Sequence, residues 1–161
     1  LENTGHGRGN PEWARVTMQR LRLFSYGTLI TGALSSRIDA LIADHCIAQW
    51  EGWVRGRLFD LGSYPGAVPA ARRGERVHGR VLELQRPGQV LPLIDQYEGY
   101  DPRAPHKSLY LREIVRVSPA NGGPPVEACI YWLNQRPAGR QRIDSGDYRQ
   151  YLGIGRTSSS S

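Results

Sequence analysis

The 161-residue sequence is 39% hydrophobic and 22% charged, which is typical of one globular domain that needs neither disulfides nor metal to fold. Its 19 glycines and 11 prolines favour many turns and short strands over a helical bundle. No apolar run approaches the roughly 20 residues of a membrane helix, so we expect no membrane partner. The first residues lack the apolar segment of a signal peptide. Cys46 and Cys129 each stand among apolar neighbours, which indicates a reducing compartment, and we expect a cytoplasmic protein.

The net charge of +6 invites a comparison with nucleic-acid-binding proteins. Most of the basic residues are arginines, which are scattered from Arg8 to Arg156, and Lys107 is the only lysine. No basic run is interleaved with aromatic residues, as a base-stacking surface requires. We therefore expect no nucleic-acid partner and interpret the positive charge as a general excess of basic residues in the composition.

The chain begins with a polar segment that has no periodic apolar face. Met18, the only methionine, stands just before the first strand pattern. We expect a disordered N-terminal extension over residues 1–17, one domain over residues 18–155 and a disordered tail over residues 156–161.

A strand pattern opens the expected domain. Residues 21–26 alternate between two faces with a period of two, and the pattern ends at Gly27. A strand that breaks at a glycine can turn consecutive backbone N–H groups outward as an anion-binding concavity. An ordinary turn has the same local sequence, so both interpretations stay open at this point.

The later elements predict the fold class. Helical spacing indicates two short helices, over residues 34–44 and 90–97, and a single helical turn over 147–152. Strand-like apolar runs between residues 46 and 61, an alternating pattern over residues 77–84 and two further strand patterns over residues 110–117 and 126–133 predict strands in these regions. Between the first two of these strands lies a turn cluster with a short apolar stretch. Together these elements predict an α+β domain, a small mixed β-barrel with short flanking helices.

Two carboxylates lie on the last turn of the second helix. Asp95 and Glu98 are three residues apart, ahead of Gly99. The negative end of the helix dipole raises the pKa of a carboxyl group slightly, which suits a proton carrier. Acidic residues at a helix end are, however, usually solvated surface groups. The pair is therefore informative only together with the rest of the pattern.

Taken in order, several short motifs resemble the γ-glutamylcyclotransferase-like family, which includes the plant AIG2-like proteins. The motifs that carry the resemblance are Phe24-Ser25-Tyr26-Gly27-Thr28-Leu29, the run from Gly56 to Gly66, Val77-His78-Gly79-Arg80-Val81, Ile94-Asp95-Gln96-Tyr97-Glu98-Gly99-Tyr100, Tyr110-Leu111-Arg112 and Ala128-Cys129-Ile130-Tyr131. The ordered set is far more specific than any one of them.

The resemblance implies a closed β-barrel enzyme that releases 5-oxoproline from a small γ-glutamyl compound without a metal or other cofactor. It implies that Glu98 is the catalytic general acid/base. It also implies a substrate-binding set formed by Tyr26, Gly27, Thr28, Leu29 and Tyr131.

The motifs leave the substrate open. γ-Glutamyl amino acids, γ-glutamyl amines and an acylated antibiotic precursor all stay possible, whereas the glutathione-specific branch is disfavoured because its Tyr-Gly-Ser-Leu motif is absent. A non-catalytic AIG2-like protein that binds a small ligand is the alternative, since a fold does not fix a function. The four histidines show no metal-ligand spacing.

Overall fold

The computed structural model describes residues 20–27 and 36–153. Both predicted terminal extensions lie outside the described residues, as do Thr28 and Leu29 of the predicted substrate loop. Among the described residues, no helix is long and apolar enough to cross a membrane.

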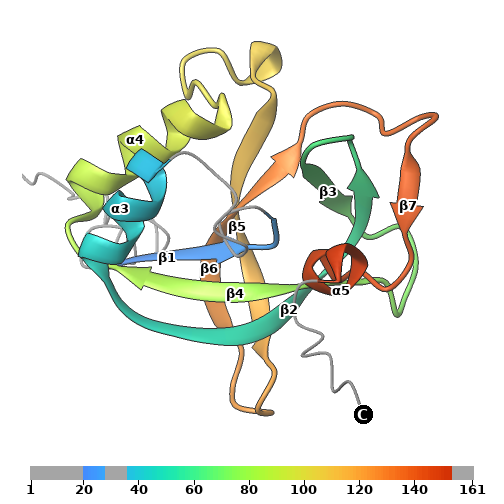
Figure 1. Cartoon of the computed structure of the whole chain (residues 1–161), viewed down its shortest axis with the longest axis horizontal. Coiled ribbons are helices and arrows are strands. Elements are labelled where there is room, and N and C mark those ends of the chain that lie inside the picture. Colours follow the sequence, from blue (N-terminus) through green and yellow to red (C-terminus); the bar gives the residue numbers. More distant parts are fainter. Residues whose placement is uncertain (1–19, 28–35, 154–161) are drawn as a thin grey trace, which may run out of the picture.

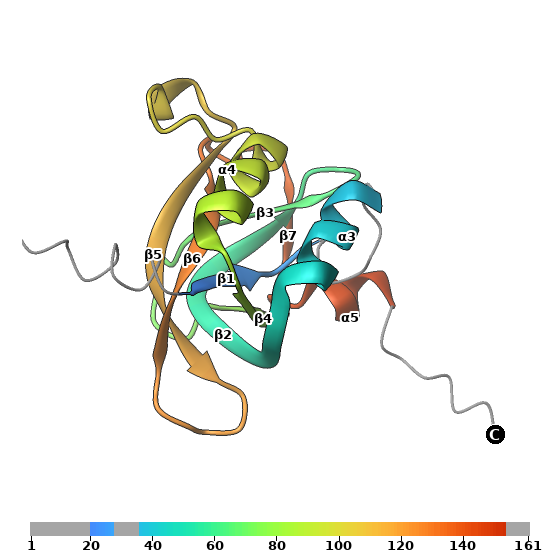
Figure 2. The same cartoon turned by 90° about the vertical axis from the view of Figure 1, so that its left-hand side faces the viewer.

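Five strands close into a mixed β-barrel (Figures 1 and 2). The strands of the barrel are β1 (Leu21–Ser25), β2 (Cys46–Asp60), β4 (Arg76–Leu84), β5 (Tyr110–Pro119) and β6 (Val126–Leu133). Their order around the barrel is β2, β4, β1, β6 and β5, and β5 pairs back with β2. The β1–β6 pair is parallel, whereas the other pairs of the barrel are antiparallel. The predicted fold class is confirmed.

The barrel closes over a short seam between β2 and β5. Only two residue pairs join these strands, Gly52 with Pro119 and Trp53 with Ser118. A Cβ atom on Gly52 would lie 2.8 Å from the carbonyl oxygen of Ser118, so a side chain at this position would push the seam apart.

Beyond the seam, β2 continues out of the barrel into a small outer sheet. There it pairs with β3 (Pro65–Pro69) and with β7 (Gln141–Ile143), both antiparallel. The sequence predicted only a turn cluster and a short apolar stretch where β3 lies, and it did not predict β7. A strand of three residues is too short to show a period of two.

Two helices cover one side of the barrel (Figures 1 and 2). These are α3 (Ser36–His45) and α4 (Pro87–Glu98), and they correspond to the two predicted helices. Helix α4 begins earlier than predicted, because Pro87 supplies the fixed φ of a first helical position. The predicted single turn is α5 (Tyr148–Leu152). A short 3-10 helix, η1 (Pro105–Lys107), lies between α4 and β5 in the chain.

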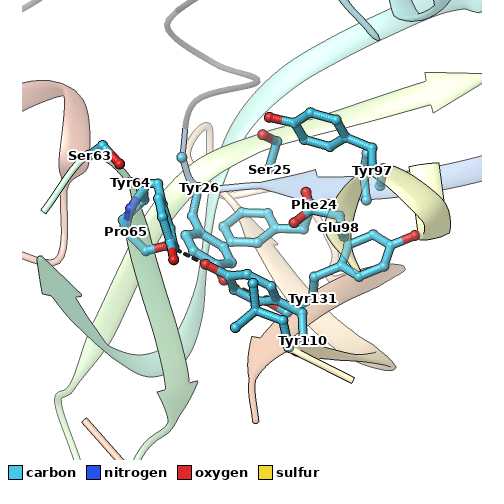
Figure 3. A pocket seen from close by; sticks show the side chains of 13 residues that line it. Phe24, Ser25, Tyr26, Ser63, Tyr64, Pro65, Tyr97, Glu98, Tyr110 and Tyr131 are labelled. Atoms are coloured by element: carbon cyan, nitrogen blue, oxygen red, sulfur yellow. Dashed lines mark hydrogen bonds between the residues drawn. The ribbon is translucent and has the colours of Figure 1, made fainter. Parts of the chain in front are cut away.

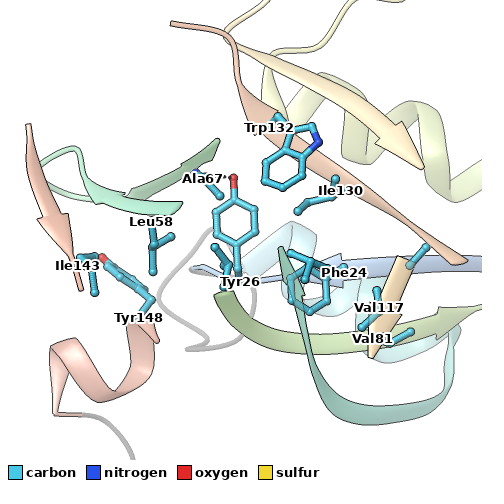
Figure 4. Close-up of a cluster of buried hydrophobic side chains, with 13 residues drawn as sticks. Phe24, Tyr26, Leu58, Ala67, Val81, Val117, Ile130, Trp132, Ile143 and Tyr148 are labelled. Carbon is cyan, nitrogen blue, oxygen red and sulfur yellow. Dashed lines mark hydrogen bonds between the residues drawn. The ribbon is translucent and has the colours of Figure 1, made fainter. Parts of the chain in front are cut away.

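Two apolar clusters hold these layers together. The first fills the barrel and extends under the outer sheet; Figure 4 shows Phe24, Tyr26, Leu58, Val81, Val117, Ile130, Trp132, Ile143 and Tyr148 within it. The second lies between the barrel and the helices and includes Leu21, Leu23, Leu84, Val90, Ile94 and Cys129. Strand β1 contributes to both, since alternate residues of a strand face opposite sides.

Candidate active site

A cavity of about 440 Å³ opens at the end of β1, which is within the range of small-molecule sites. It lies between the C-terminal end of α4 and the segment that joins β2 to β3, with β5 and β6 behind it (Figure 3). Its walls are mostly aromatic and apolar, and they consist of Leu23, Phe24, Ser25, Tyr26, Gly27, Ser63, Tyr64, Pro65, Tyr97, Glu98, Leu109, Tyr110 and Tyr131.

Glu98 is the only charged residue among these lining residues. It is the last residue of α4, and Gly99 ends the helix with a φ of 70°. The N–H of Gly99 donates to the Gln96 carbonyl at 3.2 Å, and the N–H of Tyr100 donates to the Asp95 carbonyl at 2.9 Å. This tight ending leaves the Glu98 side chain beside Phe24 and Tyr131 at the cavity (Figure 3).

The pKa of the Glu98 carboxyl is raised to about 7, chiefly by burial and secondly by the negative charge of Asp95. The helix dipole that the sequence suggested is therefore not the main cause. A carboxyl group with a pKa near neutrality is present in both protonation states, so it can accept and return a proton.

Asp95 is buried, contrary to the expectation of a solvated surface group. The Tyr131 hydroxyl donates a hydrogen bond to Asp95 Oδ1 at 2.6 Å. The Arg112 Nε atom lies 3.2 Å from the same oxygen, and the two groups form an ion pair. Burial raises the pKa of Asp95, whereas the Tyr131 hydrogen bond and the Arg112 charge oppose that rise. The residue is inward because β5 and β6 supply these two partners.

The hydroxyl groups of three tyrosines at the cavity are bound to the protein. Tyr26 donates to the carbonyl of Tyr131, and Tyr110 donates to the carbonyl of Pro65 at 2.8 Å. Tyr131 donates to Asp95, as described above. These contacts fix the phenol rings and connect β1, β3, β5 and β6 around the cavity.

Gly27 also lines the cavity, where the chain leaves β1. A Cβ atom at this position would lie 2.8 Å from Pro65 Cγ, so the small size of glycine allows the chain to approach β3. Close approach explains the glycine here, since its φ is not among the positive values.

The structure thus brings four predicted site residues to one cavity: Tyr26, Gly27, Glu98 and Tyr131. Sequence reasoning missed the cavity-lining roles of Tyr64, Pro65, Tyr97 and Tyr110, and the pairing of Arg112 with Asp95. Most of these residues stand in motifs that carried the family resemblance, and that was the available signal. Among the described residues, no group of three or more His, Cys, Asp or Glu side chains could hold a metal ion.

Solved structures with this architecture come from bacteria, animals and fungi. An AIG2-like protein from Mus musculus is 21% identical with a TM-score of 0.61, and the alignment covers 84% of this chain and 94% of that chain. YkqA from Bacillus subtilis is 23% identical with a TM-score of 0.60, and this chain spans only 44% of its length while 86% of this chain is covered. A yeast γ-glutamyl cyclotransferase specific to glutathione is 11% identical with a TM-score of 0.51, covering 71% of this chain and 69% of that chain. At these identities the likeness shows the fold alone.

Family membership comes from comparison of the amino-acid sequence. Comparison with curated proteins found no match. The family model described as γ-glutamyl cyclotransferase, AIG2-like, matches residues 23–150, which include all of the barrel strands except the first two residues of β1, and every residue that lines the cavity. The chain therefore belongs to the AIG2-like γ-glutamyl cyclotransferase family.

Proposed function

We propose that this protein is an enzyme that releases 5-oxoproline from a small γ-glutamyl amide, with Glu98 as the general acid/base. The observation that carries the proposal is the Glu98 carboxyl group in the cavity wall, with its pKa raised to about 7 by burial and by Asp95. The substrate is a small γ-glutamyl compound, and the reaction takes place in the cytoplasm without a nucleic-acid or membrane partner.

In the proposed reaction the α-amine of the γ-glutamyl group attacks its own γ-carbonyl carbon. A C–N bond forms and closes a five-membered lactam, and the bond from the carbonyl carbon to the leaving nitrogen breaks. Because the nucleophile belongs to the same molecule, the protein has chiefly to hold the folded-back rotamer. The fixed rings of Tyr26, Tyr110 and Tyr131 suit that task, since they confine the substrate's methylene carbons.

Glu98 supplies the proton transfer. Its carboxylate accepts a proton from the attacking amine and then returns a proton to the departing amine, so one group serves both halves of the reaction. Backbone N–H groups at the Gly27 turn would stabilise the developing oxyanion or bind the α-carboxylate, and one such donor contributes ~3 kcal/mol. The reaction requires no cofactor.

The test is an assay of 5-oxoproline release across a panel of γ-glutamyl amino acids and γ-glutamyl amines. Glu98→Gln keeps the size of the side chain but cannot accept the proton, so we expect turnover to fall by roughly 10²- to 10⁴-fold. Binding, measured by calorimetry, should persist because glutamine keeps the shape of the side chain and the rest of the cavity wall is unchanged.

Glu113→Gln is the matched control, since Glu113 is an exposed carboxylate on β5. Its turnover should equal that of the wild type. Full activity in Glu98→Gln would exclude the proposed mechanism. A wild-type protein that binds γ-glutamyl compounds and releases no 5-oxoproline would instead be a non-catalytic ligand-binding protein.

A further inference from the structure

The side of α4 that carries Asp95 is tied to two strands behind the cavity. The Asp95 carboxylate lies between the Tyr131 hydroxyl of β6 and the Arg112 guanidinium of β5. Arg112 and Tyr131 are direct partners across the β5–β6 pair, so the backbone register sets the position of both. Only 10% of the Asp95 side chain and 18% of the Arg112 side chain are exposed.

The same cluster extends to the residues that follow α4. The Arg112 guanidinium carbon lies 5.3 Å from the centre of the Tyr100 ring, and Tyr100 meets the Tyr131 ring edge-on at 6.4 Å. The Tyr100 N–H donates to the Asp95 carbonyl. Glu98 stands between Asp95 and Tyr100 in the chain. Because Arg112 and Tyr131 contact both Asp95 and Tyr100, they fix the chain on each side of Glu98.

We propose that Asp95 and Arg112 are positioning residues that hold the last turn of α4, and with it Glu98, against the cavity. Arg112 does not line the cavity, so it acts through Asp95 and Tyr100 and not on the substrate. Its part in turnover rests on the proposed function of Glu98, whereas its effect on the Glu98 carboxyl group does not.

The charges around Glu98 determine in which direction its pKa should move when Asp95 or Arg112 is replaced. The phenol groups of Tyr26, Tyr110 and Tyr131, at the end of β1, on β5 and on β6, interact electrostatically with Glu98, and Tyr64 and Tyr97 complete the aromatic wall. Burial raises the pKa of the Tyr26, Tyr110 and Tyr131 phenols, so these groups stay neutral when Glu98 titrates. Among the described groups, Asp95 is the anion that acts on Glu98, and Arg112 is the cation paired with Asp95.

Two substitutions should therefore move the titration in opposite directions. Asp95→Asn keeps an oxygen for Tyr131 and Arg112 but removes the negative charge, so Glu98 should titrate at lower pH than in the wild type. Arg112→Met leaves two carboxyl groups without their cation, so the second deprotonation of the Asp95–Glu98 pair should move to higher pH. NMR titration of carbon-labelled glutamate and aspartate side chains in the full chain measures both shifts.

Turnover provides the second measurement. Displacing the end of α4 should lower the kcat of Arg112→Met by about 10²-fold, and the midpoint of its pH–rate profile should move to higher pH. Arg112→Lys, which keeps the positive charge, should restore the midpoint more fully than it restores kcat. Arg116→Met is the matched control, because Arg116 is an exposed arginine on the same strand, and it should leave both quantities unchanged.

Unchanged titration in both Asp95→Asn and Arg112→Met would overturn the proposal, as would equal effects of Arg112→Met and Arg116→Met. If Arg112→Met does not fold, Asp95→Asn and Arg112→Lys decide the question through the same titration. If the wild type releases no 5-oxoproline from any γ-glutamyl compound, the proposed function fails. The titration still decides whether Asp95 and Arg112 control Glu98.

Discussion

At the scale of single residues, the proton affinity of Glu98 determines when the site is ready to react. Because the pKa of Glu98 is about 7, its base form is lost below that pH, and kcat/KM should fall about tenfold for each pH unit. The substrate amine, which must be deprotonated to attack, contributes a second such fall. A pH–rate profile of the wild type should show both, whereas Glu98→Gln should keep only the fall that belongs to the substrate. A wild-type profile with one ionisation would contradict this assignment.

Gly27 gives a second prediction at this scale. In Gly27→Val the new side chain would meet Pro65, whose carbonyl accepts the Tyr110 hydroxyl hydrogen bond. Displacement of this wall should lower kcat by about 10²-fold, while circular dichroism reports whether the fold persists. Gly88→Val is the control, because a Cβ atom at Gly88 meets nothing within 4 Å. Near-normal turnover of a folded Gly27→Val protein would place the reacting groups elsewhere.

The sequence could identify Glu98 but not the reason for its behaviour. Its place at a helix end and its surrounding motif are local features, and they suffice to select it. Two causes raise its pKa: burial, which depends on how distant elements pack around the cavity, and the charge of Asp95 on the same helix, which Arg112 of β5 and Tyr131 of β6 hold in place. Spacing along the chain contains no information about which distant side chain neutralises Asp95, so its burial could not be predicted.

At the scale of elements, the residue that begins α4 has an unfavourable backbone conformation. Arg86 is the N-cap of this helix and has a φ of 55°, a left-handed conformation that side chains disfavour by about 1 kcal/mol or more. Arg86→Gly should therefore raise the free energy of unfolding by about 0.5 kcal/mol, after the greater flexibility of unfolded glycine is subtracted. Denaturant unfolding measures this change. Arg116→Gly, in the regular strand β5, should lower the same quantity, and a loss of stability in Arg86→Gly would contradict the account.

Elements were predictable where the pattern is long. Strands β4, β5 and β6 have 9, 10 and 8 residues, which is long enough for their runs of apolar and β-branched residues to mark them as strands. The outer strand β7 pairs with the far end of β2, which lies distant in sequence, whereas β3 follows that end after a short turn. No local signal marks so distant a partner, and a strand of only three residues shows no period of its own, so β7 was missed.

At the scale of the whole molecule, Glu98 should make stability depend on pH. The folded protein holds this proton up to a pH of about 7, whereas the unfolded chain releases it near 4.5. Folding is thus favoured most below 4.5, and stability falls as the pH rises through 7, by at most about 3 kcal/mol from this group. Glu98→Gln should unfold at a higher temperature than the wild type at pH 8, and the gap should close near pH 4. An equal gap at both pH values would show that the carboxyl group is not buried as described.

The long strand β2 has a consequence for how the molecule opens. Its 15 residues run without a break from the barrel into the outer sheet, so the two sheets share one backbone. Release of the outer sheet exposes one end of a strand whose middle makes the barrel seam with β5. Amide hydrogens on both halves of β2 should therefore exchange with solvent together, as one cooperative unit. A substitution that destabilises the outer sheet should also loosen the cavity, because the outer sheet forms part of the cavity wall.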